Sequence, residues 1–212
     1  MYSIVVAEDA EPSKVSITIE SPKVEEVRIP ERMKEQVIKN SNIPASVVKE
    51  ALSWLCFTAE KDNSSVALKA NGTPNTIALE TSTDGETWKN YSLGSAIALA
   101  KSGDKVYFRA VNGGTNNSFS KDKDNYYQFE MTGKVSASGN IMSLLDASCN
   151  SVALPNTYCF KSLFENCTSL TSAPALPATT LTEGCYSSMF SGCTALKKAP
   201  TLSATTLAKD CY

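Results

Sequence analysis

The most constraining feature of this 212-residue chain is an internal repeat near its C-terminal end. Residues 159–184 and 185–210 match at 13 of 26 positions without a gap, and Cys211-Tyr212 opens a third copy. A fixed period of roughly 20–50 residues is typical of arrays in which every copy forms one coil that stacks on the next. We therefore expect residues 136–212 to contain the beginning of a solenoid.

Stacked coils place each residue above its counterpart in the next copy, so the shared positions form ladders. Counterparts face the same way at the spacing of neighbouring strands, ~4.7–4.9 Å. A free cysteine in such a ladder behaves as a small buried hydrophobe. The predicted ladders are Cys159 with Cys185 and Cys211, Cys167 with Cys193, Phe164 with Phe190, Leu170 with Leu196, Leu176 with Leu202, and Leu181 with Leu207.

The chain contains seven cysteines and no histidine. Ser–His–Asp triads, Cys–His dyads and His-ligated metals are therefore excluded within it. A structural zinc site needs four convergent ligands, and no Cys-x-x-Cys pair is present. We expect buried thiols, with some disulfide as the open alternative, and we predict no catalytic residue, no metal and no cofactor.

Charge is distributed unevenly along the chain. The net charge of −2 argues against nucleic-acid binding, which usually requires a basic face. Residues 1–50 hold nine acidic and seven basic residues, whereas residues 147–212 hold three and four. This composition predicts three units, namely an N-terminal anchor or oligomerisation arm over 1–53, a β-domain over 54–135, and a cap with repeats over 136–212.

The N-terminal arm is expected to combine short strands with a helical stretch. Alternation predicts strands at 14–20 and 24–29, and apolar spacing predicts a helix over 31–55. That helix is either a linker packed on the next domain or an oligomerisation neck. The apolar run at residues 4–7 is too short for a secretory signal, and no run reaches the ~20 apolar residues of a membrane span. We therefore expect neither export nor membrane insertion.

Residues 54–135 are predicted to form a small β-sandwich. Short β-branched and aromatic runs alternate with turn signals, of which Asp84-Gly85 is a strong hairpin signal. The aromatic side chains of this domain are expected in its core, with stacking on sugar rings as the alternative. The expected strands cover residues 55–59, 64–69, 76–81, 87–91, 96–100, 105–111 and 126–132.

The beginning and the interior of the repeat array carry further signals. Residues 139–154 are rich in apolar side chains and are predicted to cap the array at its N-terminal end. Within the second copy, Tyr186, Met189 and Phe190 lie at helical spacing, which predicts one short helical turn over residues 185–191. Both expectations place these apolar side chains inside the coils.

The second copy also carries a motif that resembles a known family. It reads Met-Phe-x-x-Cys-x-x-Leu at residues 189–196 and Ala-Pro-x-Leu-x-Ala-Thr-Thr-Leu at residues 199–207. This pattern is similar to the BspA-like leucine-rich repeats, which occur on bacterial surface proteins and in proteins of phages that infect gut Bacteroidales. The clear match covers residues 159–212, and weaker similarity to segments that precede such arrays occurs at 83–88, 103–109 and 138–145. The resemblance implies a leucine-rich-repeat fold and a role in adhesion rather than catalysis.

Together these features predict a mainly β, non-enzymatic phage virion protein, either a head or tail fibre or a capsid decoration. Residues 1–53 would bind capsid or tail proteins, and a homotrimer is the favoured oligomer. The repeats would bind a host-surface glycan or protein, or gut mucus. The expected location is the virion surface, after assembly in the host cytoplasm. The alternative is a secreted bacterial surface adhesin, located on the cell surface, whose signal was removed.

Overall fold

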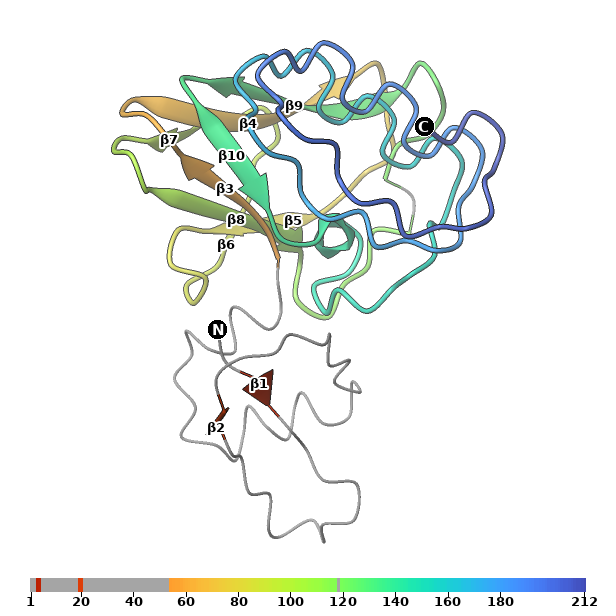
Figure 1. Cartoon of the computed structure of the whole chain (residues 1–212), viewed down its shortest axis with the longest axis horizontal. Coiled ribbons are helices and arrows are strands. Elements are labelled where there is room, and N and C mark those ends of the chain that lie inside the picture. The colour runs from red at the N-terminus through yellow and green to blue at the C-terminus, as the bar shows by residue number, and fades with distance from the viewer. Residues whose placement is uncertain (1–2, 5–18, 21–53, 118) are drawn as a thin grey trace, which may run out of the picture. The chain divides into compact units, whose positions relative to one another are not determined.

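The computed structural model of the chain divides into two compact units, Met1–Ile43 and Pro44–Tyr212. In the second unit the chain first forms two antiparallel sheets and then winds through coils that contain no regular helix or strand (Figure 1). The structure describes residues 3–4, 19–20, 54–117 and 119–212.

The described part of the first unit is one short pair of strands. β1 (Ser3–Ile4) pairs antiparallel with β2 (Ile19–Glu20), and β2 lies within the strand predicted at residues 14–20. The predicted strand at 24–29 lies outside the described residues. So does the predicted helix over 31–55, except for its last two residues, which begin the second unit's strands.

The second unit contains a five-stranded sheet in the order β10-β3-β8-β5-β6 and a three-stranded sheet in the order β7-β4-β9. All neighbouring strands are antiparallel, which confirms a mainly β fold. The strands are β3 (Leu55–Ala59), β4 (Ser64–Asn71), β5 (Leu79–Ser82), β6 (Lys89–Asn90), β7 (Ile97–Leu99), β8 (Lys105–Ala110), β9 (Tyr126–Thr132) and β10 (Val135–Ser138).

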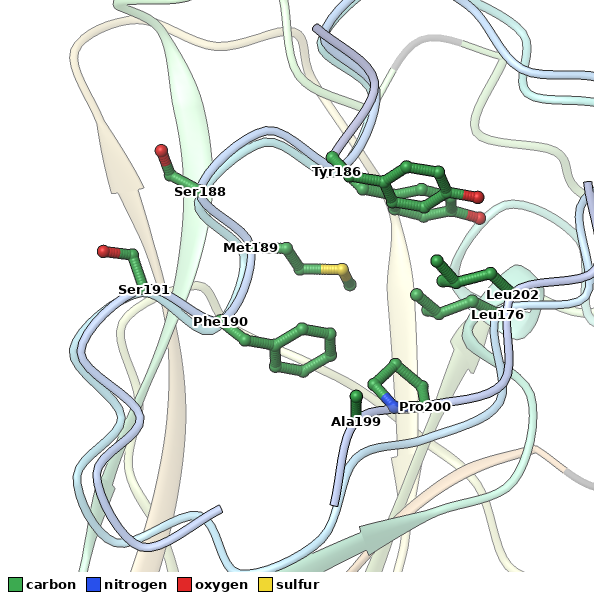
Figure 2. A pocket seen from close by; sticks show the side chains of 10 residues that line it. Leu176, Tyr186, Ser188, Met189, Phe190, Ser191, Ala199, Pro200 and Leu202 are labelled. Atoms are coloured by element: carbon green, nitrogen blue, oxygen red, sulfur yellow. The ribbon is translucent and has the colours of Figure 1, made fainter. Parts of the chain in front are cut away.

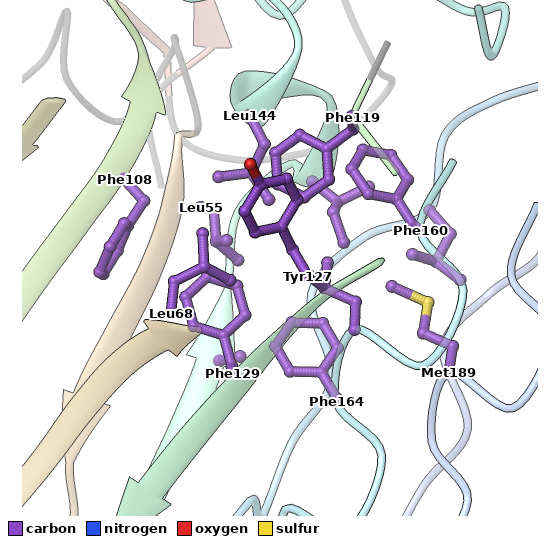
Figure 3. Close-up of a cluster of buried hydrophobic side chains, with 14 of the residues drawn as sticks. Leu55, Leu68, Phe108, Phe119, Tyr127, Phe129, Leu144, Phe160, Phe164 and Met189 are labelled. Atoms are coloured by element: carbon purple, nitrogen blue, oxygen red, sulfur yellow. The ribbon is translucent and has the colours of Figure 1, made fainter. Parts of the chain in front are cut away.

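The two sheets share one hydrophobic core. In β9, Tyr127 and Phe129 are buried while Glu130 is exposed, as expected for a strand with one face toward the core. The ring of Phe57 in the larger sheet lies edge-on to that of Phe129 in the smaller sheet, with centroids 4.8 Å apart. Figure 3 shows that the same cluster continues from the strands into Phe160 and Phe164 of the coils.

The hairpin between β5 and β6 forms where Asp84-Gly85 predicts it. Asp84 Oδ1 accepts hydrogen bonds from the backbone N–H of Glu86 at 2.7 Å and of Thr87 at 2.8 Å, and from the Ser82 hydroxyl at 2.7 Å. These donors stabilise the ionised carboxylate and hold the pKa of Asp84 below its usual value. Gly85 adopts φ +75°, which a glycine tolerates without strain.

All seven strands predicted within residues 54–135 are present, with ends that differ by a few residues. The eighth strand of this unit, β10, is missing from the prediction because its sequence of small residues gives a weak β signal. It pairs with β3 along its whole length, and Val135 and Ala137 face the core. The predicted division between residues 135 and 136 therefore falls inside β10.

A short 3₁₀ helix, η1 (Ile141–Leu144), follows β10 and closes one end of the core. All four of its residues are buried, and the Asn140 side chain accepts the backbone N–H of Met142. The Ser143 hydroxyl accepts the Leu55 N–H at 3.0 Å and donates to the Phe108 carbonyl at 2.9 Å. These bonds fix the predicted cap segment directly against β3 and β8.

One charged pair is largely buried in the larger sheet. Arg109 donates from Nε and Nη2 to the Glu80 carboxylate at 3.1 and 3.0 Å, and both side chains are mostly shielded from water. The guanidinium lies 3.7 Å from the ring centroid of Trp88 and 5.1 Å from that of Trp54, in cation–π geometry. The arrangement ties the first described residue of the unit to β5 and β8.

Candidate functional site

The repeat coils are held together by a regular backbone pattern. Within residues 158–166 every second N–H donates to the next coil at 2.7–3.0 Å, from Tyr158, Phe160, Ser162, Phe164 and Asn166 to the carbonyls of Glu183, Cys185, Ser187, Met189 and Ser191. The intervening N–H groups of Lys161, Leu163, Glu165 and Cys167 donate three residues back within their own coil, at 3.0–3.3 Å. Each amide of this segment thus has a partner, half of them in the neighbouring coil.

This pattern depends on a left-handed residue at every fourth position. Tyr158, Ser162 and Asn166 have φ of 55°, 54° and 58°, and their counterparts Gly184, Ser188 and Gly192 have 62°, 56° and 73°. A residue in this conformation ends any right-handed helix. The predicted short helical turn over residues 185–191 is therefore wrong, and the segment is a series of tight turns.

Two glycines of the second coil are required by the side chains of the first. A Cβ on Gly184 would lie 2.3 Å from ring carbons of Tyr158, and a Cβ on Gly192 would lie 2.3 Å from Asn166 Oδ1. Real Cβ contacts do not approach this closely. The coils therefore stack tightly at exactly corresponding positions of the repeat, which the 26-residue period leads one to expect.

All seven cysteines are free thiols, and the five in the predicted ladders are buried. Their Sγ atoms bond to backbone carbonyls of neighbouring segments: Cys167 to Phe129 at 3.0 Å, Cys193 to Phe164 at 2.9 Å, and Cys185 to Cys211 at 3.6 Å. Burial raises the pKa of Cys159 and raises that of Cys167 to about 12. These thiols stay protonated at neutral pH and are poor nucleophiles or metal ligands.

The predicted apolar ladders become more exposed from the first coil to the second. The rings of Phe164 and Phe190 stack in parallel with centroids 5.5 Å apart, and Leu176 forms a parallel bridge with Leu202. Leu176 is 3% exposed, but Leu202 is 47% exposed. In the same way, buried Leu170 has half-buried Leu196 above it, and half-buried Leu181 has exposed Leu207.

One ladder is absent from the sequence prediction. The rings of Phe160, Tyr186 and Tyr212 stack with centroid distances of 6.1 and 5.8 Å. The signal that could have found them is the residue after each ladder cysteine, which is aromatic in all three copies. Phe129 of β9 also stacks on Phe164, with centroids 5.4 Å apart, so one ladder begins inside the smaller sheet.

The first coil seals one edge of each sheet. Beside β9, the Phe129 N–H donates to the Leu163 carbonyl at 2.7 Å. Beside β10, the Val135 N–H donates to the Ser169 carbonyl at 3.0 Å, and the Thr171 N–H donates back to Val135 at 2.9 Å. The base of the coil stack therefore includes β9 and β10 in addition to the predicted cap segment at residues 139–154.

The second coil leaves an open end with an apolar cavity of about 320 Å³. Figure 2 shows Met189 and Phe190 pointing into it, with Leu176 and Leu202 on the opposite wall, whereas Ser188 points away. We call this surface the end face. The remaining lining residues are Tyr186, Ser191, Ala199, Pro200 and Tyr212.

Chemistry-bearing clusters are scarce in the part of the chain that the structure describes. There, no group of three or more cysteine, aspartate or glutamate side chains is placed to hold a metal ion. No helix among these residues is long and apolar enough to cross a bilayer. No family profile, curated protein or solved structure matches the chain. Its function must therefore be argued from its own residues.

Proposed function

We propose that this chain is a non-enzymatic attachment protein of a phage virion, either a head or tail fibre or a capsid decoration. In this proposal residues 136–212 begin a BspA-like leucine-rich-repeat solenoid that rises from the two-sheet unit. The observation that carries it is the hydrogen-bonded stacking of the first coil on β9 and β10 and of the second coil on the first. A rigid stack fixed to a folded base suits the display of repeated surface positions.

The outward positions of the coils are suited to polar recognition. Serine and threonine occupy 19 of the last 66 positions. Thr179 and Thr180 are exposed on the first coil, and their counterparts Thr205 and Thr206 are exposed on the second. Identical hydroxyls repeated from coil to coil favour weak contacts that add up on a polyvalent ligand such as a surface glycan or mucus.

The thiols favour the phage over the secreted adhesin. All seven cysteines are unpaired, although several lie on adjacent coils. Thiols persist in the reducing cytoplasm, where phage proteins fold and assemble, whereas exported proteins pass through oxidising compartments. In this proposal residues 1–53 bind capsid or tail proteins, and the assembled protein is a homotrimer at the virion surface.

Two measurements test the proposal. Mass spectrometry of purified particles from the source should detect this chain, and its presence in cell-envelope fractions alone would overturn the phage assignment. Retention of the purified chain on immobilised mucin or host envelope should fall at least several-fold in the variant Thr205→Ala/Thr206→Ala. The matched control is Thr83→Ala/Ser102→Ala, two exposed positions on the two-sheet unit. Equal retention of both variants would contradict binding through the coils.

A further inference from the structure

The end face carries a row of backbone donors without acceptors. Ser162, Phe164 and Asn166 donate their N–H groups to the second coil, but no described residue accepts the N–H of their counterparts Ser188, Phe190 and Gly192. Ser188 and Gly192 keep the left-handed φ of the first coil, at 56° and 73°, so their amides have the same orientation. The end face therefore presents donors at every second residue.

The apolar ladders also end at this surface. Phe164 is fully buried because Phe190 stacks over it, whereas Phe190 is only half-buried. Leu202 and Tyr212 are 47% and 43% exposed although their counterparts one coil below are buried. The cavity of about 320 Å³ lies between these side chains. Large exposed apolar patches mark a surface that another structure covers.

A third coil has already begun on this surface. The Gly184 N–H donates to the Lys209 carbonyl at 2.9 Å, and the Tyr186 N–H donates to the Cys211 carbonyl at 2.9 Å. The Tyr212 ring stacks on that of Tyr186 at an interplanar angle of 15°. These contacts repeat those that Tyr158 and Phe160 make with the second coil, so residues 209–212 occupy the first positions of a third coil.

We propose that the end face is a docking surface for a third coil of the same 26-residue repeat, joined to Tyr212. This inference rests on the proposed repeat array and names the residues that extend it. Ser162 bonds to Ser187, 25 residues later, and the same step from Ser188 leads to the residue directly after Tyr212. The first, third and fifth residues after Tyr212 would thus supply carbonyls to Ser188, Phe190 and Gly192.

The polarity of the end face selects this occupant over a second copy packed face to face. Two end faces related by a two-fold axis would set the same donor row of one copy against that of the other. Buried amides without acceptors cost free energy, so such a pair is disfavoured. A repeat coil instead presents carbonyls, as the segment 183–191 does to the first coil, and it brings a further aromatic side chain for Phe190 to stack on.

The test extends the full chain by 24 residues that copy residues 187–210, so that Cys211-Tyr212 and the addition form one complete third coil. The matched control carries the same 24 residues in scrambled order, and a second variant adds only the six residues that copy 187–192. Amide hydrogen exchange is measured by NMR, with the amides of β3 and β8 showing that the two-sheet unit is folded. This readout does not depend on any attachment activity, so it can fail or succeed independently of the proposed function.

With the copied coil, exchange at Ser188, Phe190 and Gly192 should slow at least tenfold, and the six-residue addition should slow it partly. Met189 and Ser191, which already bond within their coil, should change less. Unchanged exchange at the three amides in both extended variants, or equal protection by the scrambled sequence, would overturn the proposal. So would protection in the original chain that grows with protein concentration, because a second copy would then be the occupant.

Discussion

Replacing Gly184 by alanine tests the close approach of the two coils. Gly184 has φ +62°, and an added Cβ would lie 2.3 Å from two ring carbons of Tyr158. The left-handed backbone costs an alanine about 1–2 kcal/mol, of which ~0.4–1 kcal/mol is offset by the stiffer unfolded chain. The half-buried Tyr158 ring must also move aside and gives up part of the ~1.5–3 kcal/mol of a fully buried large side chain.

Gly94 provides the matched control for this variant. It has φ +80°, and nothing lies within 4 Å of a Cβ built on it, so Gly94→Ala carries the backbone cost alone. We expect Gly184→Ala to lower the free energy of unfolding by about 2–3 kcal/mol and Gly94→Ala by about 1 kcal/mol, from the same backbone and burial magnitudes. For a unit of this size, each kcal/mol lowers Tm by about 2–4 °C.

Urea unfolding followed by circular dichroism gives both free energies by linear extrapolation. The double variant Tyr158→Ala/Gly184→Ala removes the obstructing ring, so its loss should be smaller than the sum of the two single losses by about 1 kcal/mol, the range of coupling between contacting residues. Equal destabilisation by Gly184→Ala and Gly94→Ala, or strict additivity in the double variant, would refute the tight stacking of the coils.

Three further changes probe other parts of the second unit. Arg109→Leu strands the shielded Glu80 carboxylate, and urea unfolding should show a loss of about 3 kcal/mol, whereas replacing both partners by apolar residues should cost much less. Phe164→Ala should cost about 3–5 kcal/mol by the same assay, and Phe190→Ala clearly less, because Phe190 is only half-buried; the reverse order would contradict the open end. Since burial raises the pKa of Cys167 to about 12, its neutral thiol contributes stability that is present below the unfolded pKa, near 9, and is lost as pH rises toward 12. Alkylation of native protein at pH 9, read by mass spectrometry, should spare Cys167, and rapid labelling there would contradict its burial.

The strands were the most predictable part of the second unit. Alternation of side chains and turn residues locates β3 to β9, because each of these strands has one face toward the core and ends at a polar or glycine-containing turn. β10 escapes the same reasoning since Val-Ser-Ala-Ser carries little β propensity. It is held in place by β3 on one side and by the first coil on the other, which are contacts distant in sequence.

The repeat was predictable in period but not in local conformation. The spacing of Tyr186, Met189 and Phe190 fits a helix, yet left-handed Ser188 turns the chain before a helix can form. Ser188 can adopt this conformation because its N–H and those of its neighbours are directed between coils, and a sequence pattern does not report that constraint. The aromatic ladder through Tyr186 was detectable, since an aromatic follows the first cysteine of every copy.

The alternation of hydrogen bonds within and between coils also determines how the stack responds to force. The bonds between coils run from each coil to the next, one for every second residue of the segment. A pull on Tyr212 therefore loads the pairs of the outermost coil one after another, so the stack peels from its free end at low force. The strands of the larger sheet, joined along their lengths by ladders on both sides of β3, would remain folded until the coils had been drawn out.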